Sequence, residues 1–256
     1  MMRFASLGSG SGGNALLVES GDTLILLDCG FGLADTSARL ARVGREPGDI
    51  DAIIVTHEHE DHAGGVARLA RRHELPVYLT YGTLAALGRD RGALPDAVLF
   101  DGHSGFAIGD IEVQPFPVPH DAREPVQFVL GNGAARLGVL TDIGTPTAHV
   151  AQMLSGLEAL VLECNHDRAM LDAGPYPPPL KERVGGPFGH LENAAAARLL
   201  GELDRSRLQH VMAAHLSQQN NTPALARAAL AGALGCEPEW IGVATQDEGF
   251  GWRQIT

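Results

Sequence analysis

His57-Glu58-His59-Glu60-Asp61-His62 reads H-x-H-x-D-H and is the most specific pattern in the chain. The apolar run Ile53-Ile54-Val55 precedes it and predicts a short buried strand. Ala63-Gly64-Gly65 and a helical pattern over Val66–Arg72 follow, which places the six residues on a strand-to-helix turn at the edge of a sheet. Neutral imidazole is the commonest metal ligand, and a neighbouring carboxylate suits a hard, water-activating metal. The pattern therefore predicts a metal site, and its specificity disfavours the alternative of a solvated polar turn.

The composition is that of a globular protein with a sizeable core. The 256 residues are 45% hydrophobic and could form one large domain or two small ones. No apolar run is long enough for a transmembrane helix, and Met1-Met2-Arg3-Phe4 leads straight into a strand-like segment without a separate leader. Cys29, Cys164 and Cys236 are odd in number and far apart, which predicts no disulfide framework and fits a reducing cytoplasm.

The charge of the chain restricts the kind of partner it can bind. The net charge is −12, from 31 acidic and 19 basic residues, and Lys181 is the single lysine. This balance disfavours a broad phosphate-binding surface and tight binding of a long duplex. Bound divalent metals would add positive charge locally, so a phosphodiester in a cleft stays compatible with the composition.

Short apolar runs and helical patterns cover most of the chain without strict alternation. Strands are predicted at residues 4–7, 15–18, 24–27, 53–55, 77–79, 98–100, 111–116, 127–130, 136–140, 160–162, 210–213 and 241–244. Helices are predicted at residues 36–43, 66–73, 82–87, 147–154, 193–203 and 223–234. Met170–Phe188, which contains Pro175-Tyr176-Pro177-Pro178-Pro179, is predicted to be a loop. The pattern favours an α+β fold in which helices cover two sheets, a four-layer αββα sandwich.

Three further polar residues follow apolar strands. His120 comes after Val118-Pro119, Asp142 after Gly138–Thr141, and His215 after Val211–Ala214. Taken singly, His120 suits an ordinary loop histidine and Asp142 a turn or helix cap. Taken together with the hexad, polar side chains at the ends of three strands predict one site at one rim of a sheet.

These residues resemble the metallo-β-lactamase fold superfamily along nearly the whole chain, which implies a single domain over residues 1–256. The resemblance implies that His57, His59 and His120 bind a first metal ion. It implies that Asp61, His62 and His215 bind a second ion and that Asp142 bridges the two. It also places Asp28, in Leu27-Asp28-Cys29-Gly30, behind the ligand loop as its support; the alternative is a plain turn aspartate.

Finer motifs resemble the YycJ (WalJ) branch, whose relatives include cyclic phosphodiesterases and tRNA 3′-end nucleases. The motifs are Gly8–Asn14, Glu163-Cys164-Asn165-His166-Asp167, Gly189-His190-Leu191-Glu192-Asn193, His215-Leu216-Ser217 and Asn220-Asn221. The chain departs from the branch at Glu192 and Gly12, which weakens the assignment of substrate more than that of chemistry.

The same resemblance suggests which residues act on the substrate. It implies that His190, expected at a helix start that favours anions, protonates the leaving oxygen. Asp61 is also expected to be catalytic, besides binding a metal ion. The expected substrate-binding residues are Ser11, Asn165, His166, Ser217 and Asn221. Alternatives stay open: a hairpin turn for the glycine-serine run, a structural cap for Asn165-His166-Asp167, and a capping or surface histidine for His190.

The expected activity is phosphodiester hydrolysis with two divalent metal ions, zinc or manganese. Two ions about 3.5–4 Å apart can hold a bridging hydroxide and stabilise charge on the electrophile's oxygen. The substrate would be a phosphodiester such as a nucleic acid or a nucleotide, and the oligomeric state is open. The alternative is hydrolysis of a thioester, lactone or β-lactam at the same ligands. A flavodiiron-like redox enzyme is disfavoured because His59 stands where such sites have a carboxylate, and a structural metal site would be closed and mononuclear.

Overall fold

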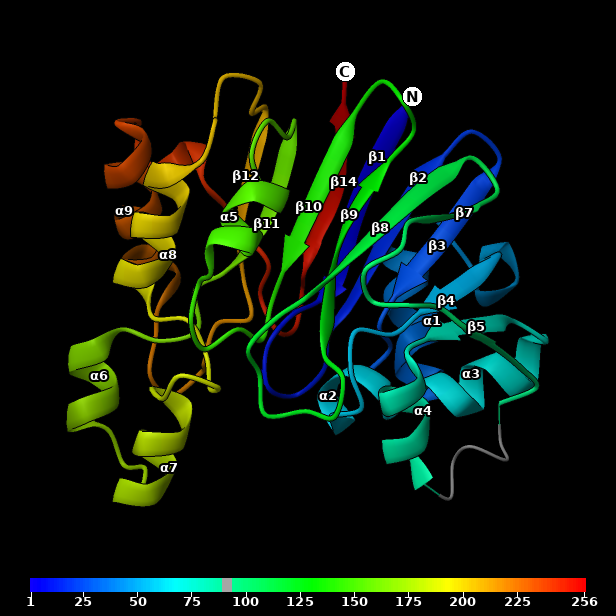
Figure 1. Ribbon diagram of the computed structural model, residues 1–256, viewed down its shortest axis with the longest axis horizontal. Coiled ribbons are helices and arrows are strands. Elements are labelled where there is room, and N and C mark those ends of the chain that lie inside the picture. Colours follow the sequence, from blue (N-terminus) through cyan, green and yellow to red (C-terminus); the bar gives the residue numbers. More distant parts are fainter. Residues whose placement is uncertain (89–93) are drawn as a thin grey trace.

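Two mixed β-sheets face each other at the centre of the computed structural model, which describes residues 1–88 and 94–256 (Figure 1). In the described residues each sheet has seven strands, in the orders β14-β1-β2-β3-β4-β5-β6 and β13-β12-β11-β10-β9-β8-β7. Helices α1, α3 and α4 lie outside the first sheet, and α5, α8 and α9 lie outside the second. The predicted four-layer αββα sandwich is therefore confirmed.

The bounds of the elements are as follows. The first sheet and its helices comprise β1 (Met2–Gly8), β2 (Ala15–Ser20), β3 (Thr23–Leu27), α1 (Leu33–Arg42), η1 (Pro47–Asp49), β4 (Ala52–Ile54), α2 (Glu60–Ala63), α3 (Val66–His73), β5 (Pro76–Leu79), α4 (Tyr81–Ala86), β6 (Asp96–Leu99) and, from the far end of the chain, β14 (Phe250–Ile255). The second comprises β7 (Phe106–Ile108), β8 (Ile111–Pro117), β9 (Val126–Gly131), β10 (Arg136–Leu140), α5 (Ala148–Met153), β11 (Ala159–Glu163), α6 (Arg168–Ala173), α7 (Pro178–Val184), α8 (Asn193–Glu202), β12 (His210–Ala214), α9 (Pro223–Leu234), η3 (Pro238–Trp240) and β13 (Gly242–Val243).

The side chains of successive strand residues enter different cores because they alternate between the two faces of a sheet. Phe4, Val18 and Ile25 belong to the core between the sheets. Leu17 and Leu26, one position along, belong to the core between the first sheet and its helices. A third core lies under α5, α8 and α9. Burial on both faces explains why these strands read as continuous apolar runs.

Five strand ends meet at one rim of the sandwich, the lower rim in Figure 1. Strands β3 and β4 are parallel neighbours, and so are β10, β11 and β12, so each group ends at a common edge. Glycines let the loops at this rim pass close together: a Cβ atom at Gly30 or Gly65 would overlap the backbone oxygen of Asp61 or Phe31, respectively. The polar residues that follow these strands are thereby brought to one place.

The loop predicted for Met170–Phe188 is wrong, because this segment holds the end of α6 and all of α7. The Asp167 side chain caps α6 by accepting a hydrogen bond from the Met170 amide. Proline at the first positions of α7 suits a helix start, where its missing N–H is not needed. Strands β7 and β14 were also missed: both are edge strands, and β14 is largely exposed.

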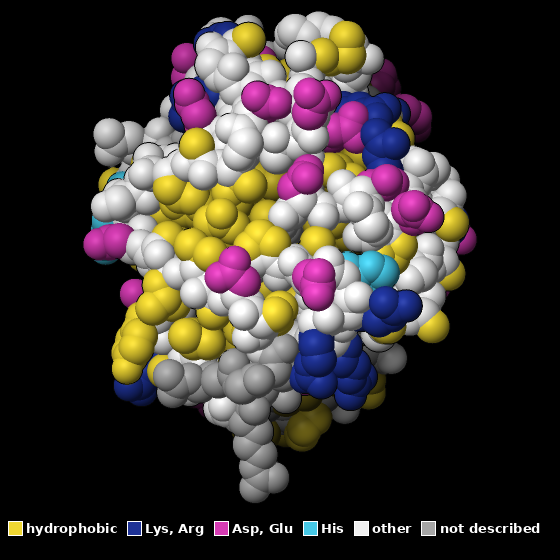
Figure 2. Space-filling view, turned by 90° about the vertical axis from the view of Figure 1, so that its right-hand side faces the viewer, with side chains coloured by type: hydrophobic (Ala, Val, Ile, Leu, Met, Phe, Trp, Pro, Cys, Tyr) yellow, Lys and Arg dark blue, Asp and Glu magenta, His cyan; other side chains and the backbone are white. Residues whose placement is uncertain are grey.

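Aromatic rings close the edge of the sandwich between β6 and β7. Tyr78 and Phe106 stack with ring centroids 5.6 Å apart, and Phe100 stacks on Phe106 at 5.0 Å. Figure 2 looks onto this side of the molecule and shows hydrophobic side chains gathered across its centre. Among the described residues, no helix has both the length and the apolar character to cross a membrane.

Candidate metal centre

Three residues at the rim adopt the left-handed backbone conformation that residues other than glycine rarely occupy. Asp28 directly follows β3, Asp142 lies just beyond the end of β10, and His215 directly follows β12. Their φ angles are 59°, 53° and 55°, respectively. Such conformations cost free energy and gather at functional sites, where they aim a side chain. Here they turn three polar side chains back over the strand ends.

Three imidazole rings converge at one side of the rim. His57 Nε2 lies 3.0 Å from His59 Nδ1, and His120 Nε2 lies 3.3 Å from the same atom. Ring nitrogens that face each other this closely suit ligands around a shared cation better than partners in a hydrogen bond. These three residues could hold one divalent ion.

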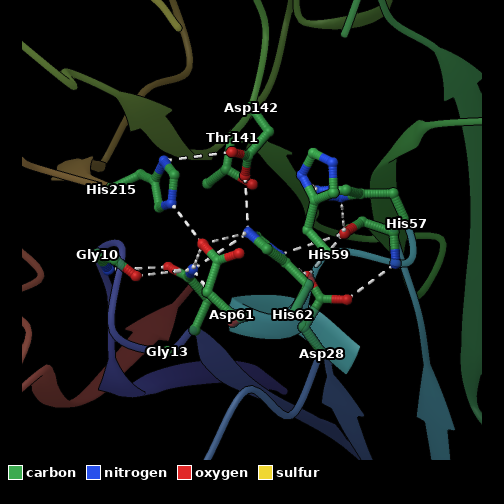
Figure 3. Close-up of polar contacts among 12 residues, drawn as sticks. Gly10, Gly13, Asp28, His57, His59, Asp61, His62, Thr141, Asp142 and His215 are labelled. Atoms are coloured by element: carbon green, nitrogen blue, oxygen red, sulfur yellow. Dashed lines mark hydrogen bonds and ion pairs between the residues drawn. The ribbon is translucent and has the colours of Figure 1, made fainter. Parts of the chain in front are cut away.

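A second group of donor atoms lies beside the first. Asp61 Oδ2 lies 3.3 Å from His215 Nε2 and 3.4 Å from His62 Nε2. Figure 3 shows Asp61 between the two rings, with the loop of Gly10 and Gly13 beside it. Asp61, His62 and His215 could hold a second divalent ion.

Asp142 joins the two groups. Its Oδ2 lies 2.9 Å from His62 Nε2, and its Oδ1 lies 3.9 Å from His120 Nε2 and 3.4 Å from His215 Nδ1. Oδ2 is buried yet forms no hydrogen bond in the described structure. A buried carboxylate oxygen without a hydrogen bond, among histidine nitrogens, fits a ligand shared by two cations. The seven residues predicted from the sequence are thus brought together by the fold.

Hydrogen bonds behind the rings orient them toward the centre of the cluster. Such partners fix which imidazole nitrogen is free to bind a metal. His62 Nδ1 contacts Asp28 Oδ2 at 2.7 Å, and Asp28 also accepts from the Thr56 amide and hydroxyl at 2.8 Å each. His57 Nδ1 contacts Thr56 Oγ1 at 3.0 Å, and His120 Nδ1 donates to the Gly189 carbonyl at 3.1 Å. Asp28 therefore has the supporting position that the sequence predicted.

Glu163 is the residue of the site that sequence reasoning missed. It ends β11, is fully buried, and its Oε1 contacts His190 Nδ1 at 2.9 Å and His215 Nδ1 at 3.0 Å. Its Oε2 accepts the amides of Ile143 at 2.9 Å and Leu191 at 3.1 Å. The sequence did contain a signal for Glu163: it is an acidic residue at the end of an apolar strand. Asp28 and Asp142 have similar positions, each just after an apolar strand. Glu163 links a proposed ligand to the histidine expected to act on the substrate.

The carboxylates control the protonation of the histidines around them. Burial lowers the pKa of His215, but Asp142 and the hydrogen bond to Asp61 outweigh burial and raise it to about 10. The pKa of His62 is likewise raised, against burial, by Asp142, Asp28 and Asp61. Burial raises the pKa of Asp142, but the neighbouring His215 and His62 hold it well below its usual range. A cation that binds here competes with protons on these rings, so its binding releases protons.

The pKa values of His57 and His120 are shifted in the opposite direction, downward. Burial lowers the pKa of both rings, and for His57 the neighbouring His62 lowers it further. Neutral imidazole is the form that binds metals. His57 and His120 are therefore in their metal-binding form at neutral pH, whereas His62 and His215 favour their protonated form when no cation is bound.

The structure separates the predicted substrate-binding residues. Ser11 is exposed and lines the cleft over the cluster. The other four are buried and do not line that cleft; they are Asn165, His166, Ser217 and Asn221. Polar atoms of three of them hold the loops: the amide group of Asn165 donates to the His215 carbonyl, that of Asn221 to the Cys164 carbonyl, and Ser217 Oγ accepts the Asn220 amide. These three side chains support the site, and contact of the four with substrate stays a prediction.

His190 lies at the cluster but not at a helix N-terminus. Helix α8 begins at Asn193 with Glu192 as its N-cap, and the Asn193 amide already donates to the His166 carbonyl. Binding of an anion by the first amides of α8 is therefore not supported. The position of His190 is set instead by Glu163 and by its own amide, which donates to the Val184 carbonyl at 2.8 Å.

A cleft of about 360 Å³ opens over the cluster. It is lined by Ser11, His59, Glu60, Asp61, Asp121, Asp142, Tyr176, Leu180, Arg183, Val184, Gly189, His190 and His215. Tyr176 to Val184 come from the segment that the sequence predicted to be a loop. Donor atoms for cations and one wall of α7 thus share one open cleft.

The two facing sheets with this cluster at their rim form a metallo-β-lactamase fold. The chain superposes on zinc-bound PqqB from Methylobacterium extorquens with a TM-score of 0.77 at 17% identity, over 99% of this chain and all of the other. Residues 23–212 match the family model of the beta-lactamase superfamily domain.

The chain therefore belongs to the beta-lactamase superfamily. It is 36% identical to "Exodeoxyribonuclease YycJ" from Bacillus anthracis over 228 residues, 88% of this chain and 86% of that protein. It is 30% identical to "Exodeoxyribonuclease WalJ" from Streptococcus pneumoniae over 245 residues, 94% of this chain and 91% of that protein. The resemblance predicted from the motifs is confirmed.

Proposed function

We propose that this protein is a metal-dependent phosphodiesterase that acts on nucleic acid. The observation that carries the proposal is the placement of His190, held by Glu163 at 2.9 Å, beside a cluster of seven donor residues in an open cleft. The names of the two relatives that span most of the chain, both exodeoxyribonucleases, support this substrate class.

The proposed metal centre holds two divalent ions. His57, His59 and His120 would hold one, Asp61, His62 and His215 the other, and Asp142 would contact both. The nitrogen-rich donor set suits zinc, and the two carboxylates also suit manganese. Two such ions supply an activated water at neutral pH and positive charge toward the phosphate oxygens.

His190 is the proposed proton donor. Glu163 holds its Nδ1, so Nε2 is the nitrogen free to meet a substrate, and the ring lines the cleft. Burial lowers the pKa of His190, but the hydrogen bond and charge of Glu163 and the charge of Asp142 raise it. A protonated imidazole at this place can give its proton to the oxygen that leaves phosphorus. Hydrolysis of a thioester or lactam at the same ligands would not require this pair.

The proposed compartment is the cytoplasm. Cys29, Cys164 and Cys236 are all free thiols, which supports a reducing environment.

The test compares substrate classes on one metal-loaded preparation. Bis-p-nitrophenyl phosphate and a single-stranded oligonucleotide are assayed beside a thioester and a chromogenic cephalosporin. We expect hydrolysis of the phosphodiesters, its loss with a chelator, and a loss of several orders of magnitude in Asp142→Ala because the shared ligand is gone. Brisk cleavage of the thioester or cephalosporin, with none of the phosphodiesters, would replace the proposal by carbonyl hydrolysis.

A further inference from the structure

The wall of the cleft formed by α7 and the loop before it differs from the other walls in charge and chemistry. Of the described residues that line the cleft, Glu60, Asp61, Asp121 and Asp142 are acidic, and Arg183 is the one that is Lys or Arg. Tyr176 lies on the same wall. Among the described lining residues, Arg183 is therefore the one permanently positive side chain that a polyanionic substrate meets, and it shares its wall with Tyr176.

Arg183 has a free binding edge. Its Nε donates to Asp121 Oδ2 at 2.7 Å, and its side chain is 63% exposed. Its two terminal amino groups form no hydrogen bond with any described residue. An exposed ion pair contributes little stability, so the guanidinium can move to a phosphate that offers two charge-assisted hydrogen bonds. The Asp121 side chain is 32% exposed, so water can solvate its carboxylate when Arg183 leaves.

Tyr176 offers a rigid aromatic face. It is half-buried and lies between Pro175 and the run Pro177-Pro178-Pro179, whose rings restrict the backbone on both sides. Within the described part of the chain its hydroxyl has no hydrogen-bond partner. An aromatic ring that loses little conformational freedom on binding is suited to stacking on a nucleic acid base.

The size of the cleft limits what can bind between these groups. Its volume, about 360 Å³, is at the small end of the roughly 300–1,000 Å³ of ligand sites. A cleft of this size favours one unpaired nucleotide at the end of a strand.

We infer that Tyr176 and Arg183 recognise the terminal nucleotide of a nucleic acid strand, Tyr176 by stacking on its base and Arg183 by binding its phosphate in exchange for Asp121. This inference rests on the proposed function, because it names the substrate of the same site. It makes the α6–α7 segment the part of the chain that selects strand ends.

The first test removes the base from the substrate. Thymidine 5′-(p-nitrophenyl phosphate) and methyl p-nitrophenyl phosphate share a leaving group, so the ratio of their kcat/KM values reports recognition of the nucleoside. Stacking typically changes affinity by about 5- to 150-fold per base, and we expect Tyr176→Ala to lower the ratio within that range. Tyr176→Leu, which keeps apolar contacts, should lower it equally, whereas Tyr176→Phe should retain it. Tyr81→Ala is the matched control, since Tyr81 is 64% exposed and does not line the cleft. An unchanged ratio in both Tyr176→Ala and Tyr176→Leu would overturn the inference for Tyr176.

The second test measures binding without catalysis. Fluorescence anisotropy follows a labelled, phosphorothioate-linked single-stranded oligothymidylate as the salt concentration rises. One lost phosphate contact should reduce the slope of log K against log salt by about 0.7 in Arg183→Gln. Arg168→Gln is the matched control, because Arg168 also pairs through Nε with an aspartate, Asp172 at 3.1 Å, and is 59% exposed. Equal slopes for wild type and Arg183→Gln would overturn the inference for Arg183.

The two tests separate this inference from the proposed function. If the wild type hydrolysed neither ester, the proposed function would fail, and anisotropy on the Tyr176 and Arg183 variants would still decide whether they bind a strand. If it hydrolysed both esters but Tyr176→Ala, Tyr176→Leu and Arg183→Gln matched the wild type in both tests, the proposed function would stand and the inference would fail.

Discussion

Replacing Glu163 by glutamine tests how one buried carboxylate orders the whole site. Oε2 of Glu163 accepts two backbone amides, and Oε1 contacts the Nδ1 atoms of His190 and His215. Glutamine has one acceptor oxygen and one NH₂ group. Turning the NH₂ toward the amides would leave two buried donors unsatisfied, at about 1–3 kcal/mol each. The amide oxygen must therefore take the place of Oε2, and the NH₂ group must face the two histidines.

This orientation reverses the tautomers of both rings. His190 and His215 must then accept a hydrogen bond at Nδ1 and carry their proton on Nε2. For His215, the Nε2 atom that lies 3.3 Å from Asp61 would no longer offer a lone pair to a cation. For His190, the imidazolium that serves as proton donor would be disfavoured. We expect the metal content to fall from two ions toward one.

The magnitude follows from two known effects. Loss of a general acid removes about 10²–10⁴-fold in rate, and a carboxylate-to-amide change behind the histidine of a serine protease costs about 10⁴-fold through the wrong tautomer. We expect a loss of about 10³–10⁴-fold in kcat for Glu163→Gln on an unactivated oligonucleotide. Glu163 raises the pKa of His190, so its removal lowers that pKa. The proton donor is then lost at lower pH, and the alkaline fall of kcat/KM should move to lower pH.

Glu158→Gln is the matched control. Glu158 is a buried glutamate at the opposite end of β11, where it accepts the Arg136 amide and pairs with Arg207. Its substitution should lower the melting temperature without changing metal content or kcat. The assays are elemental metal analysis, steady-state kinetics across pH and thermal unfolding. Two bound ions and a wild-type rate in Glu163→Gln would refute the tautomer argument.

Three further outcomes are expected. His190→Ala should leave metal content unchanged and lose about 10²–10⁴-fold in rate on poor leaving groups, with a smaller loss on p-nitrophenyl esters, which depart without a proton; an equal loss on both would show that His190 binds phosphate or holds the fold instead. Burial raises the pKa of Cys29 to about 11 and also raises that of Cys164, whereas Cys236 is partly exposed. A thiol reagent should therefore react with Cys236 alone in the folded protein and with all three cysteines in denaturant. Rapid labelling of Cys29 in the folded state would contradict its buried placement. Phe128 is fully buried between the sheets, so its replacement by alanine should lower the free energy of unfolding by about 3–5 kcal/mol in a denaturant titration. A change near zero would contradict its place in that core.

Much of the site was predictable because local sequence encodes strand ends. The hexad follows an apolar run, and His120, Asp142 and His215 each follow another, so the amino-acid pattern alone predicts that they meet at one rim. Glu163 carried the same signal but stood inside a motif that was interpreted as substrate-binding. Its role depends on which side chains lie across from it, and sequence spacing does not contain that information.

The prediction for Met170–Phe188 failed where tertiary contacts outweighed local pattern. The proline run before α7 reads as a loop, yet proline at a helix start and a capping aspartate before α6 allow two short helices. The sequence also does not reveal that Asn165, His166, Ser217 and Asn221 are buried. Asn165 and Asn221 donate to the carbonyls of His215 and Cys164, because buried backbone groups of these loops need hydrogen-bond partners.

The sequence by itself predicted the fold class from its apolar pattern, and the resemblance of its motifs indicated the family and implied the set of donor residues, because such patterns are local properties that survive without three-dimensional contacts. Only the tertiary structure decided which imidazole nitrogen faces the centre, that Asp28, Asp142 and His215 are held in left-handed conformations, and that Glu163 joins His190 to His215. It also decided that α7 brings Tyr176 and Arg183 to the cleft. These features depend on contacts between segments far apart in the chain, and such contacts exist only once both sheets have packed together.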